Sequence, residues 1–182
     1  MKKWSFSIVA FVVLGLALYV FHANAANAEK VEKPPAKAEA VSLGPKVPGS
    51  GAALWDFLKK EDYEKNWKIW PGTTAFHHGT QPHGILLTTY VNAIALRAIE
   101  AKKGALPDGS IIVTENYGAE KWLESLTVMY KIKGYNPGEN DWFWAKYGPE
   151  GTIAAEGKLN LCQDCHYEKR SNDYIWTARL KY

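Results

Sequence analysis

The sequence predicts an α+β domain that is built mainly on an antiparallel β-sheet with a few helices. Strand-like runs dominate the second half of the chain, and apolar residues at helical spacing occur in two stretches of the first half. Short turns separate the strand-like runs, so neighbouring runs pair antiparallel, because parallel pairing needs a long crossover connection. The length of 182 residues and the hydrophobic content of 47% suffice for one domain with a core.

The first 28 residues are typical of a Sec-type signal peptide. Two lysines precede an apolar run from Ile8 to Phe21, and cleavage after Ala25 or Ala28 would follow an Ala-Asn-Ala triplet. The alternative is an uncleaved anchor that tethers the protein to a membrane, because the apolar run could almost cross a bilayer. In either case the folded domain is expected in the periplasm or on the outer face of the cell envelope.

Residues 29–51 predict a linker. They are rich in Pro, Ala, Lys and Glu, and they bury too little apolar surface to offset the entropy of ordering. The folded domain is therefore assigned to residues 52–182. Loss of Lys2 and Lys3 with the signal lowers the formal net charge from +3 to +1, so no basic surface indicates a nucleic-acid partner.

Helices are expected in two places before the strand-rich half. Residues 52–67 place apolar side chains at helical spacing among charged ones and predict a short amphipathic helix. Residues 83–104 begin as an extended, strand-like entry and continue as a helix that stops at Gly104. The sequence LPDG at 106–109 is a turn signal that leads into the sheet.

Four strands are expected after that turn, joined in a meander. Their boundaries follow from the turns NPGEN and PEG, and they cover residues 110–118, 123–135, 141–148 and 151–160. The third places Trp142 and Trp144 on one face and Phe143 and Tyr147 on the other. A strand with bulky groups on both faces is covered on both sides.

The two cysteines of the chain, Cys162 and Cys165, stand three positions apart, and His166 follows directly. Cys-x-x-Cys-His is the attachment sequence for c-type haem, in which two thiols bond covalently to haem vinyl groups and the histidine binds the iron. The motif therefore predicts one covalent haem c, held by Cys162 and Cys165, with His166 as the proximal iron ligand. Covalent attachment also takes place outside the cytoplasm, in agreement with an export signal.

Three other interpretations of the motif are a redox-active cysteine pair, a structural disulfide, and half of a zinc site. A redox pair normally begins a helix that follows a strand in a βαβ unit, which the sequence does not predict here. A zinc site needs two more ligands of suitable type nearby.

The chain resembles the cytochrome P-460 family, which includes the cytochrome c′-beta proteins. The resemblance is carried by LPDGSIIVTENYG (106–118), by the long run from Leu126 to Thr177 that holds DWFWAKY, CxxCH and DYIWT in that order, and by HGTQPHGILLTTYVNAIALRAIEAKKG (78–104). It implies a β-rich α+β domain in which one haem c packs against the sheet, commonly in a homodimer. One face of the DWFWAKY strand would then meet the porphyrin.

The resemblance also draws attention to Thr114. In members with the P-460 chromophore, a lysine after the Asp-Gly turn bonds to a haem meso carbon, and this crosslink supports hydroxylamine oxidation. Asp108, Gly109 and Glu115 match that pattern, but Thr114 takes the place of the lysine. The crosslink is therefore expected to be absent, with Tyr117 and Lys121 as less favoured substitutes.

The other histidines and Met129 bear on the sixth iron position, which the family tends to leave open. His77, His78 and His83 lie in a loop punctuated by Gly and Pro, where histidines more often make loop hydrogen bonds. If one of them bound the iron, with His83 and His77 as candidates, the protein would be a six-coordinate electron carrier. Met129 is expected to pack in the core.

The leading expectation is an exported cytochrome with an open distal site that binds or turns over nitric oxide or hydroxylamine. The six-coordinate electron-transfer cytochrome is the alternative. Whether the protein is an enzyme stays open: an oxidoreductase acting on these nitrogen compounds would pass electrons to a redox partner protein. For a catalytic role on the distal side, the sequence offers Thr114 as a candidate.

Overall fold

The computed structural model describes residues 49–181, which belong to the compact unit Glu39–Tyr182. The predicted signal at 1–28 and all but the last residues of the predicted linker lie outside the described residues. Within residues 49–181, no helix combines the length and the apolar character needed to cross a membrane.

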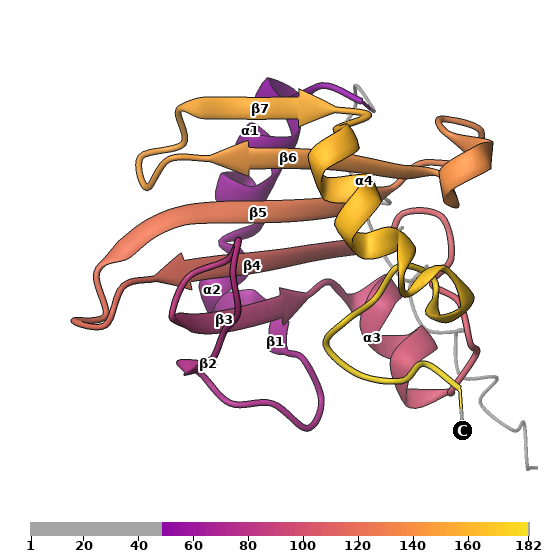
Figure 1. Cartoon of the computed structure of the whole chain (residues 1–182), viewed down its shortest axis with the longest axis horizontal. Coiled ribbons are helices and arrows are strands. Elements are labelled where there is room, and N and C mark those ends of the chain that lie inside the picture. The colour runs from indigo at the N-terminus through magenta and orange to yellow at the C-terminus, as the bar shows by residue number, and fades with distance from the viewer. Residues whose placement is uncertain (1–48, 182) are drawn as a thin grey trace, which may run out of the picture. The chain divides into compact units, whose positions relative to one another are not determined.

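One antiparallel sheet organises the domain, as the sequence predicts (Figure 1). Its strand order is β1-β3-β4-β5-β6-β7, and the short β2 also pairs with β3. The strands are β1 (Lys68–Ile69), β2 (His77–His78), β3 (Leu86–Val91), β4 (Ile111–Tyr117), β5 (Leu123–Lys131), β6 (Trp142–Tyr147) and β7 (Ile153–Gly157). The helices are α1 (Gly51–Glu61), α2 (Tyr63–Asn66), α3 (Ala93–Glu100) and α4 (Asn160–Tyr167), with short 3-10 turns at Pro137–Glu139 and Arg170–Asn172. The prediction of an α+β domain on an antiparallel sheet is confirmed.

The predicted helix at 52–67 is two helices. Helix α1 begins one residue earlier, at Gly51, where the Ser50 side chain accepts a hydrogen bond from the backbone N–H of Ala53. Asp62 takes a left-handed backbone conformation (φ 46°) and separates α1 from α2. Charge periodicity alone does not report this break, because aspartate is also a normal surface residue of a helix.

The strand-to-helix transition predicted in 83–104 is confirmed as β3 followed by α3. Asn92 stands between the two elements and caps the helix, since its Oδ1 accepts from the backbone N–H of Ala95. The same oxygen accepts from the N–H of Ile111, and Nδ2 donates to the carbonyl of Gly109. One buried amide thus joins β3, α3 and the start of β4.

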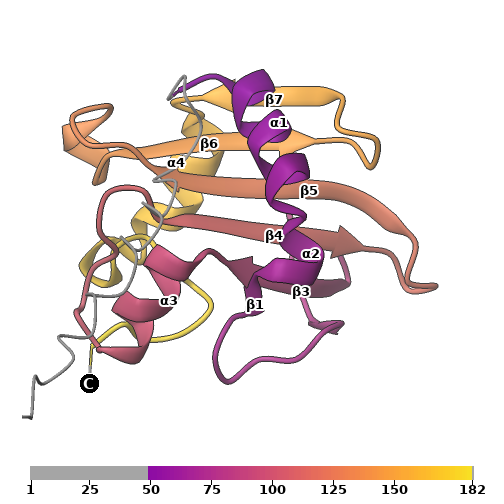
Figure 2. The same cartoon turned by 180° about the vertical axis from the view of Figure 1, so that it is seen from behind.

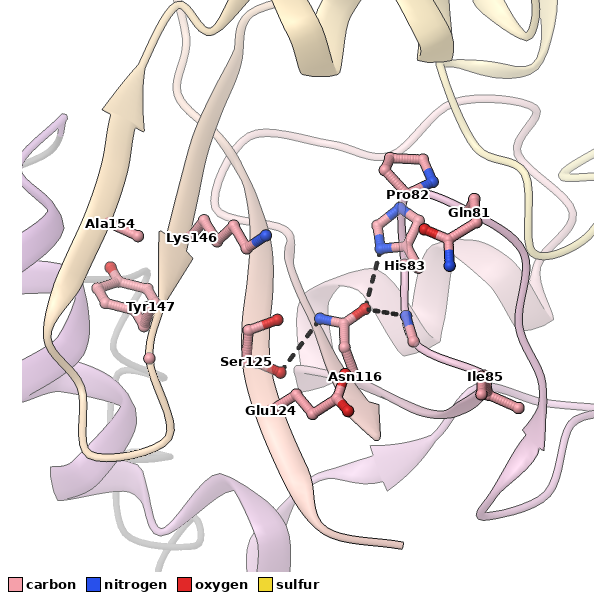
Figure 3. A pocket seen from close by; sticks show the side chains of 12 residues that line it. Gln81, Pro82, His83, Ile85, Asn116, Glu124, Ser125, Lys146, Tyr147 and Ala154 are labelled. Atoms are coloured by element: carbon pink, nitrogen blue, oxygen red, sulfur yellow. Dashed lines mark hydrogen bonds between the residues drawn. The ribbon is translucent and has the colours of Figure 1, made fainter. Parts of the chain in front are cut away.

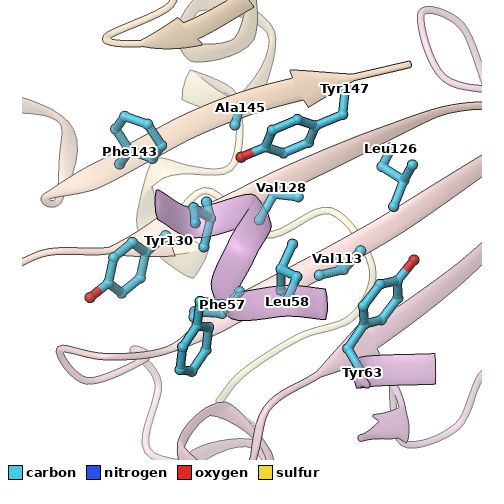
Figure 4. Close-up of a cluster of buried hydrophobic side chains, with 12 residues drawn as sticks. Phe57, Leu58, Tyr63, Val113, Leu126, Val128, Tyr130, Phe143, Ala145 and Tyr147 are labelled. Atoms are coloured by element: carbon cyan, nitrogen blue, oxygen red, sulfur yellow. The ribbon is translucent and has the colours of Figure 1, made fainter. Parts of the chain in front are cut away.

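The rear face of the sheet carries one of two buried apolar clusters, beneath helices α1 and α2 (Figure 2). Helices α1 and α2 cover this face and pack Leu54, Leu58 and Tyr63 against side chains of β4, β5 and β6. Figure 4 shows part of this cluster, with Phe143 and Tyr147 entering it from β6. Leu54, Leu58 and Tyr147 have no exposed surface, so the rear face is sealed.

The front face carries a second buried cluster that includes Trp142 and Trp144 together with residues of α3 and the C-terminal segment. Phe143 and Tyr147 of the same strand, β6, belong to the rear cluster. The alternation of faces predicted for β6 is therefore confirmed. Helix α4 crosses this front face in Figure 1. The sheet is covered on both sides, by helices behind and by α4, α3 and coil in front.

Candidate functional site

Helix α4 carries both cysteines, at its third and sixth residues. Cys162 and Cys165 are three residues apart, a spacing that puts both on one side of a helix. Neither forms a disulfide; Cys162 is half-buried and Cys165 is exposed. Burial raises the pKa of the Cys162 thiol. The sequence does not predict this helix, because residues 159–167 show no apolar periodicity.

His166, the next residue of the motif, is held in one orientation. Its Nδ1 lies 2.6 Å from the backbone carbonyl oxygen of Tyr174. A carbonyl only accepts, so Nδ1 carries the proton and Nε2 keeps its lone pair. Burial lowers the pKa of His166, which favours the neutral ring that metal binding requires. The ring of Trp144 lies edge-on at 4.8 Å between ring centres.

The carbonyl that orients His166 belongs to a tightly anchored turn. Asp173 and Tyr174 both have left-handed backbone conformations (φ 56° and 67°), and both side chains are bonded to the rest of the domain. The Asp173 carboxylate pairs with Lys131 and accepts from Asn140, while Tyr174 donates to a carboxylate oxygen of Glu139.

A chamber of about 450 Å³ opens in front of the motif. One wall is α4 with the coil at 175–177, the floor is the front face of the sheet, and the opposite wall is the segment from Thr73 to His83. We call this cavity the chamber. Three stretches that are distant in sequence therefore converge on the Cys-x-x-Cys-His motif.

Three neighbouring threonines and one lysine cross the chamber floor in register. Thr89, Thr114 and Thr127 are paired across β3, β4 and β5, and Thr127 is paired with Lys146 of β6. The Thr89 and Thr114 hydroxyl oxygens lie 3.4 Å apart, and Thr127 Oγ1 lies 3.4 Å from the Thr114 carbonyl oxygen. The structure places Thr114 on the chamber floor. Lys146 is a chamber residue that was not predicted, although its alternation with Trp142 and Trp144 along β6 is a signal that places it on this face.

His83 lies on the wall opposite α4, beside a second cavity. This cavity, which we call the outer recess, measures about 530 Å³ and shares His83 and Lys146 with the chamber. Figure 3 shows the recess and the hydrogen bond of 3.0 Å between His83 Nδ1 and Asn116 Oδ1. Burial lowers the pKa of His83.

The remaining candidates from the sequence fall in different places. His77 and His78 line the chamber, and so does Met129, which is also buried in the front cluster as expected. Tyr117 and Lys121 do not line it: the Tyr117 hydroxyl donates to Glu115, and the Lys121 ammonium lies 4.8 Å from the Phe76 ring centre. Neither is positioned as a substitute for the missing lysine.

The chamber residues fit a haem. Most of the exposed lining is apolar, as a porphyrin requires, and the two thiols and the His166 Nε2 lone pair stand on the same wall. The Nε1–H of Trp144, a chamber residue, is buried without a hydrogen-bond partner within residues 49–181. This nitrogen is enclosed by protein, so the fit to haem rests on the two thiols, the His166 ring and the apolar lining.

The structure does not favour the interpretation of the motif as a redox-active cysteine pair or as half of a zinc site. Helix α4 carries both cysteines and follows strand β7, but no strand follows α4 within residues 49–181, so there is no βαβ unit. A raised thiol pKa at Cys162 is the opposite of what activates a redox cysteine. Residues 49–181 contain no cluster of three or more His, Cys, Asp or Glu side chains that could hold a metal ion.

Comparison with models of protein families finds a match to this chain. A family model described as Cytochrome P460 matches residues 60–177, about two thirds of the chain. The matched stretch runs from the end of α1 through the Cys-x-x-Cys-His motif to the coil that closes the chamber. A search of curated proteins finds no match.

Proposed function

The chain belongs to the cytochrome P460 family, and on that basis we propose that it is an exported c-type cytochrome that binds nitric oxide and hydroxylamine at one covalently held haem. The family implies a haem protein that acts on nitrogen compounds. The covalent attachment, the number of haems, the export and the particular ligands are the proposed part.

The observation that carries the proposal is the placement of the motif on α4. Cys162 and Cys165 would form the thioether bonds, and His166 would bind the iron through Nε2. The Tyr174 carbonyl fixes the tautomer that leaves this nitrogen free, as second-sphere groups do at metal-binding histidines. When bound, haem supplies an iron that coordinates small nitrogen ligands and can change oxidation state.

Thr114 supports binding as the main activity. Its side chain ends in a neutral hydroxyl close to the sheet, and a neighbouring hydroxyl and carbonyl surround it. A threonine is too short and too weak a nucleophile to replace the lysine that crosslinks haem in the hydroxylamine-oxidising members. Oxidation of hydroxylamine or turnover of nitric oxide, with electrons passed to a redox partner protein, is the enzymatic extension of the same proposal.

A second candidate function is electron transfer with both axial positions occupied by protein. The observation that favours it is the His83 imidazole on the chamber wall opposite α4. A protein of this kind would exchange electrons and would not take up nitric oxide. The two candidates therefore differ in a directly measurable property.

Absorption spectra of the full chain, matured with haem in an export-competent host, test the proposal. Spectra are recorded for the ferric and the dithionite-reduced protein, with and without nitric oxide. An ordinary haem c spectrum that changes on addition of nitric oxide is the expected result. A spectrum that stays unchanged at saturating nitric oxide in both oxidation states would favour the electron carrier.

The proposal includes a location and an assembly. The protein would act in the periplasm or on the outer face of the envelope, with the chain before the domain as spacer or tether. A homodimer is proposed from the family resemblance. Size-exclusion chromatography with light scattering on the haem-loaded protein measures the assembly, and mass spectrometry of the mature N-terminus locates any cleavage.

A further inference from the structure

The ring of His83 lies 6.2 Å from the ring of His166, measured between ring centres, and the two rings are inclined by 76°. The two histidines stand on opposite walls of the chamber, one on the segment before β3 and one on α4. Among the three histidines of residues 77–83, His83 is the one whose ring contacts His166 in the described structure.

The tautomer of His83 follows from its partner. The side-chain amide of Asn116 donates through Nδ2 to the carbonyl oxygens of Thr114 and Ser125, at 3.1 and 3.2 Å, which fixes Oδ1 as the atom that faces His83. Oδ1 accepts, so His83 Nδ1 carries the proton and Nε2 keeps its lone pair. His83 is therefore prepared in the same way as His166, with Nδ1–H bonded to oxygen and Nε2 free.

The separation of the rings distinguishes a ligand from a bystander. Metal–imidazole bonds of about 2 Å, with each nitrogen about 1 Å from its ring centre, place the centres of two axial imidazoles about 6 Å apart. A histidine that only hydrogen-bonds an iron-bound ligand stands roughly 2 Å further away, because that ligand lies between them. The observed 6.2 Å equals the separation that both rings need if their Nε2 atoms point at one iron between them.

The backbone holds His83 at this position. A Cβ on the next residue, Gly84, would lie 2.5 Å from the backbone nitrogen of Tyr117 and 2.6 Å from its oxygen. The chain after His83 therefore lies directly against β4, which only glycine allows. The N–H of Gly84 also lies 3.4 Å from Asn116 Oδ1, so one amide oxygen orients both residues.

We propose that His83 is the sixth iron ligand of the resting protein, and that nitric oxide or hydroxylamine reaches the iron by displacing it. The inference rests on the proposed function, because it names the distal ligand of the haem iron that the proposed function places in the chamber. The outer recess, which His83 also lines, provides space on the far side of the displaced ring. The resting protein would then have both axial iron positions occupied, as in the electron-transfer candidate, and would still bind nitric oxide, as in the leading candidate.

The test uses electron paramagnetic resonance and near-infrared magnetic circular dichroism on the ferric, haem-loaded full chain. The wild type is expected to be low-spin with two imidazole ligands without any added ligand, and His83→Ala is expected to be high-spin. Added imidazole should return His83→Ala to low-spin. His78→Ala, which removes another chamber histidine, is the matched control and should keep the wild-type spectrum.

Ligand binding gives the second readout. If His83 occupies the iron in most molecules, its removal should strengthen apparent nitric oxide binding to the ferric protein by at least about tenfold. A high-spin wild type would overturn the inference even if His83→Ala failed to mature, and so would a low-spin spectrum with an amine ligand such as Lys146. A high-spin wild type that binds nitric oxide would leave the proposed function intact. A wild type with two histidine ligands, combined with a His83→Ala variant that binds no nitric oxide, would refute the proposed function and leave the ligand assignment intact.

Discussion

The ammonium nitrogen of Lys131 lies 2.5 Å from the carboxylate of Asp173, in the interior of the domain. Lys131 ends β5, and Asp173 precedes the residue whose carbonyl orients His166. The backbone carbonyl of Asp173 also accepts from the Nε1–H of Trp142, and its carboxylate accepts from the backbone N–H of Leu106. One buried ion pair therefore connects the sheet to the turn behind the proximal ligand.

Asp173→Ala is expected to lower the free energy of unfolding by about 3–5 kcal/mol, because it leaves the buried Lys131 ammonium without its counter-charge. Urea unfolding of the haem-loaded protein, followed by far-UV circular dichroism, measures the change. The exposed pair of Lys59 and Asp56 supplies the control, since Asp56→Ala should cost less than about 1 kcal/mol. Equal losses in the two variants would contradict the structural role assigned to Asp173.

Covalent attachment of haem should depend on both cysteines. Cys162→Ala and Cys165→Ala should each retain one thioether, and the double variant should lose haem on a denaturing gel stained for haem. Mass spectrometry of the purified chain should show one haem added to the wild type. His166→Ala should keep the thioethers if it matures but change the ferric spectrum. Covalent haem in the double variant would refute the assignment of the motif.

Thr114→Lys should install the missing lysine on the chamber floor. We expect a crosslink to haem in at least part of the protein, visible as a red-shifted ferrous band and as a haem peptide that contains residue 114. Thr127→Lys, one strand away in the same cross-strand row, is the matched control and should keep an ordinary haem c spectrum. If both variants keep the unmodified spectrum and peptide mass, Thr114 does not occupy the crosslinking position.

Glu115 should make stability fall as the pH rises. Its carboxylate is buried behind the sheet, and burial raises its pKa above the ordinary 4.5, although hydrogen bonds from Tyr117 and Tyr63 oppose that rise. As the pH rises, Glu115 therefore loses its proton in the unfolded chain at a lower pH than in the folded protein. The stability that Glu115 contributes is complete below pH 4.5 and is lost as the pH rises to the folded pKa.

Glu115→Gln should remove this decline. The free energy of unfolding of the variant, relative to that of the wild type, should rise between pH 4.5 and the folded pKa of Glu115. The slope should be about 1.4 kcal/mol per pH unit. Urea unfolding at several pH values measures the difference, with Glu124→Gln on the exposed surface as the control. Parallel curves for wild type and Glu115→Gln would show that burial does not govern this group.

Much of the fold could be predicted because its signals are local. The four-strand meander follows from turn residues and alternation, and the faces of Trp144 and Phe143 follow from parity along β6. Strands β1 and β2 escaped prediction because each has two residues, too few for any period. Helix α4 escaped because its residues are arranged for the motif and carry no apolar stripe.

The candidate site divides in the same way. The motif with Cys162, Cys165 and His166 is readable because all its members are adjacent in sequence. The pairing of His83 with Asn116, and its approach to His166, depend on contacts across 33 and 83 residues that only the folded chain creates. The sequence offered two candidate loop histidines, His83 and His77, and the structure places His83 against His166.

Alternate residues of strand β6 lie on the chamber side and in the rear apolar cluster. Trp144 and Lys146 face the chamber, while Phe143 and Tyr147 are sealed in the cluster behind the sheet. Lys146 is exposed, so substitutions there can change the polarity of the chamber without disturbing the packing that keeps the domain folded. The architecture therefore allows new ligand specificities to evolve one residue at a time on an unchanged scaffold.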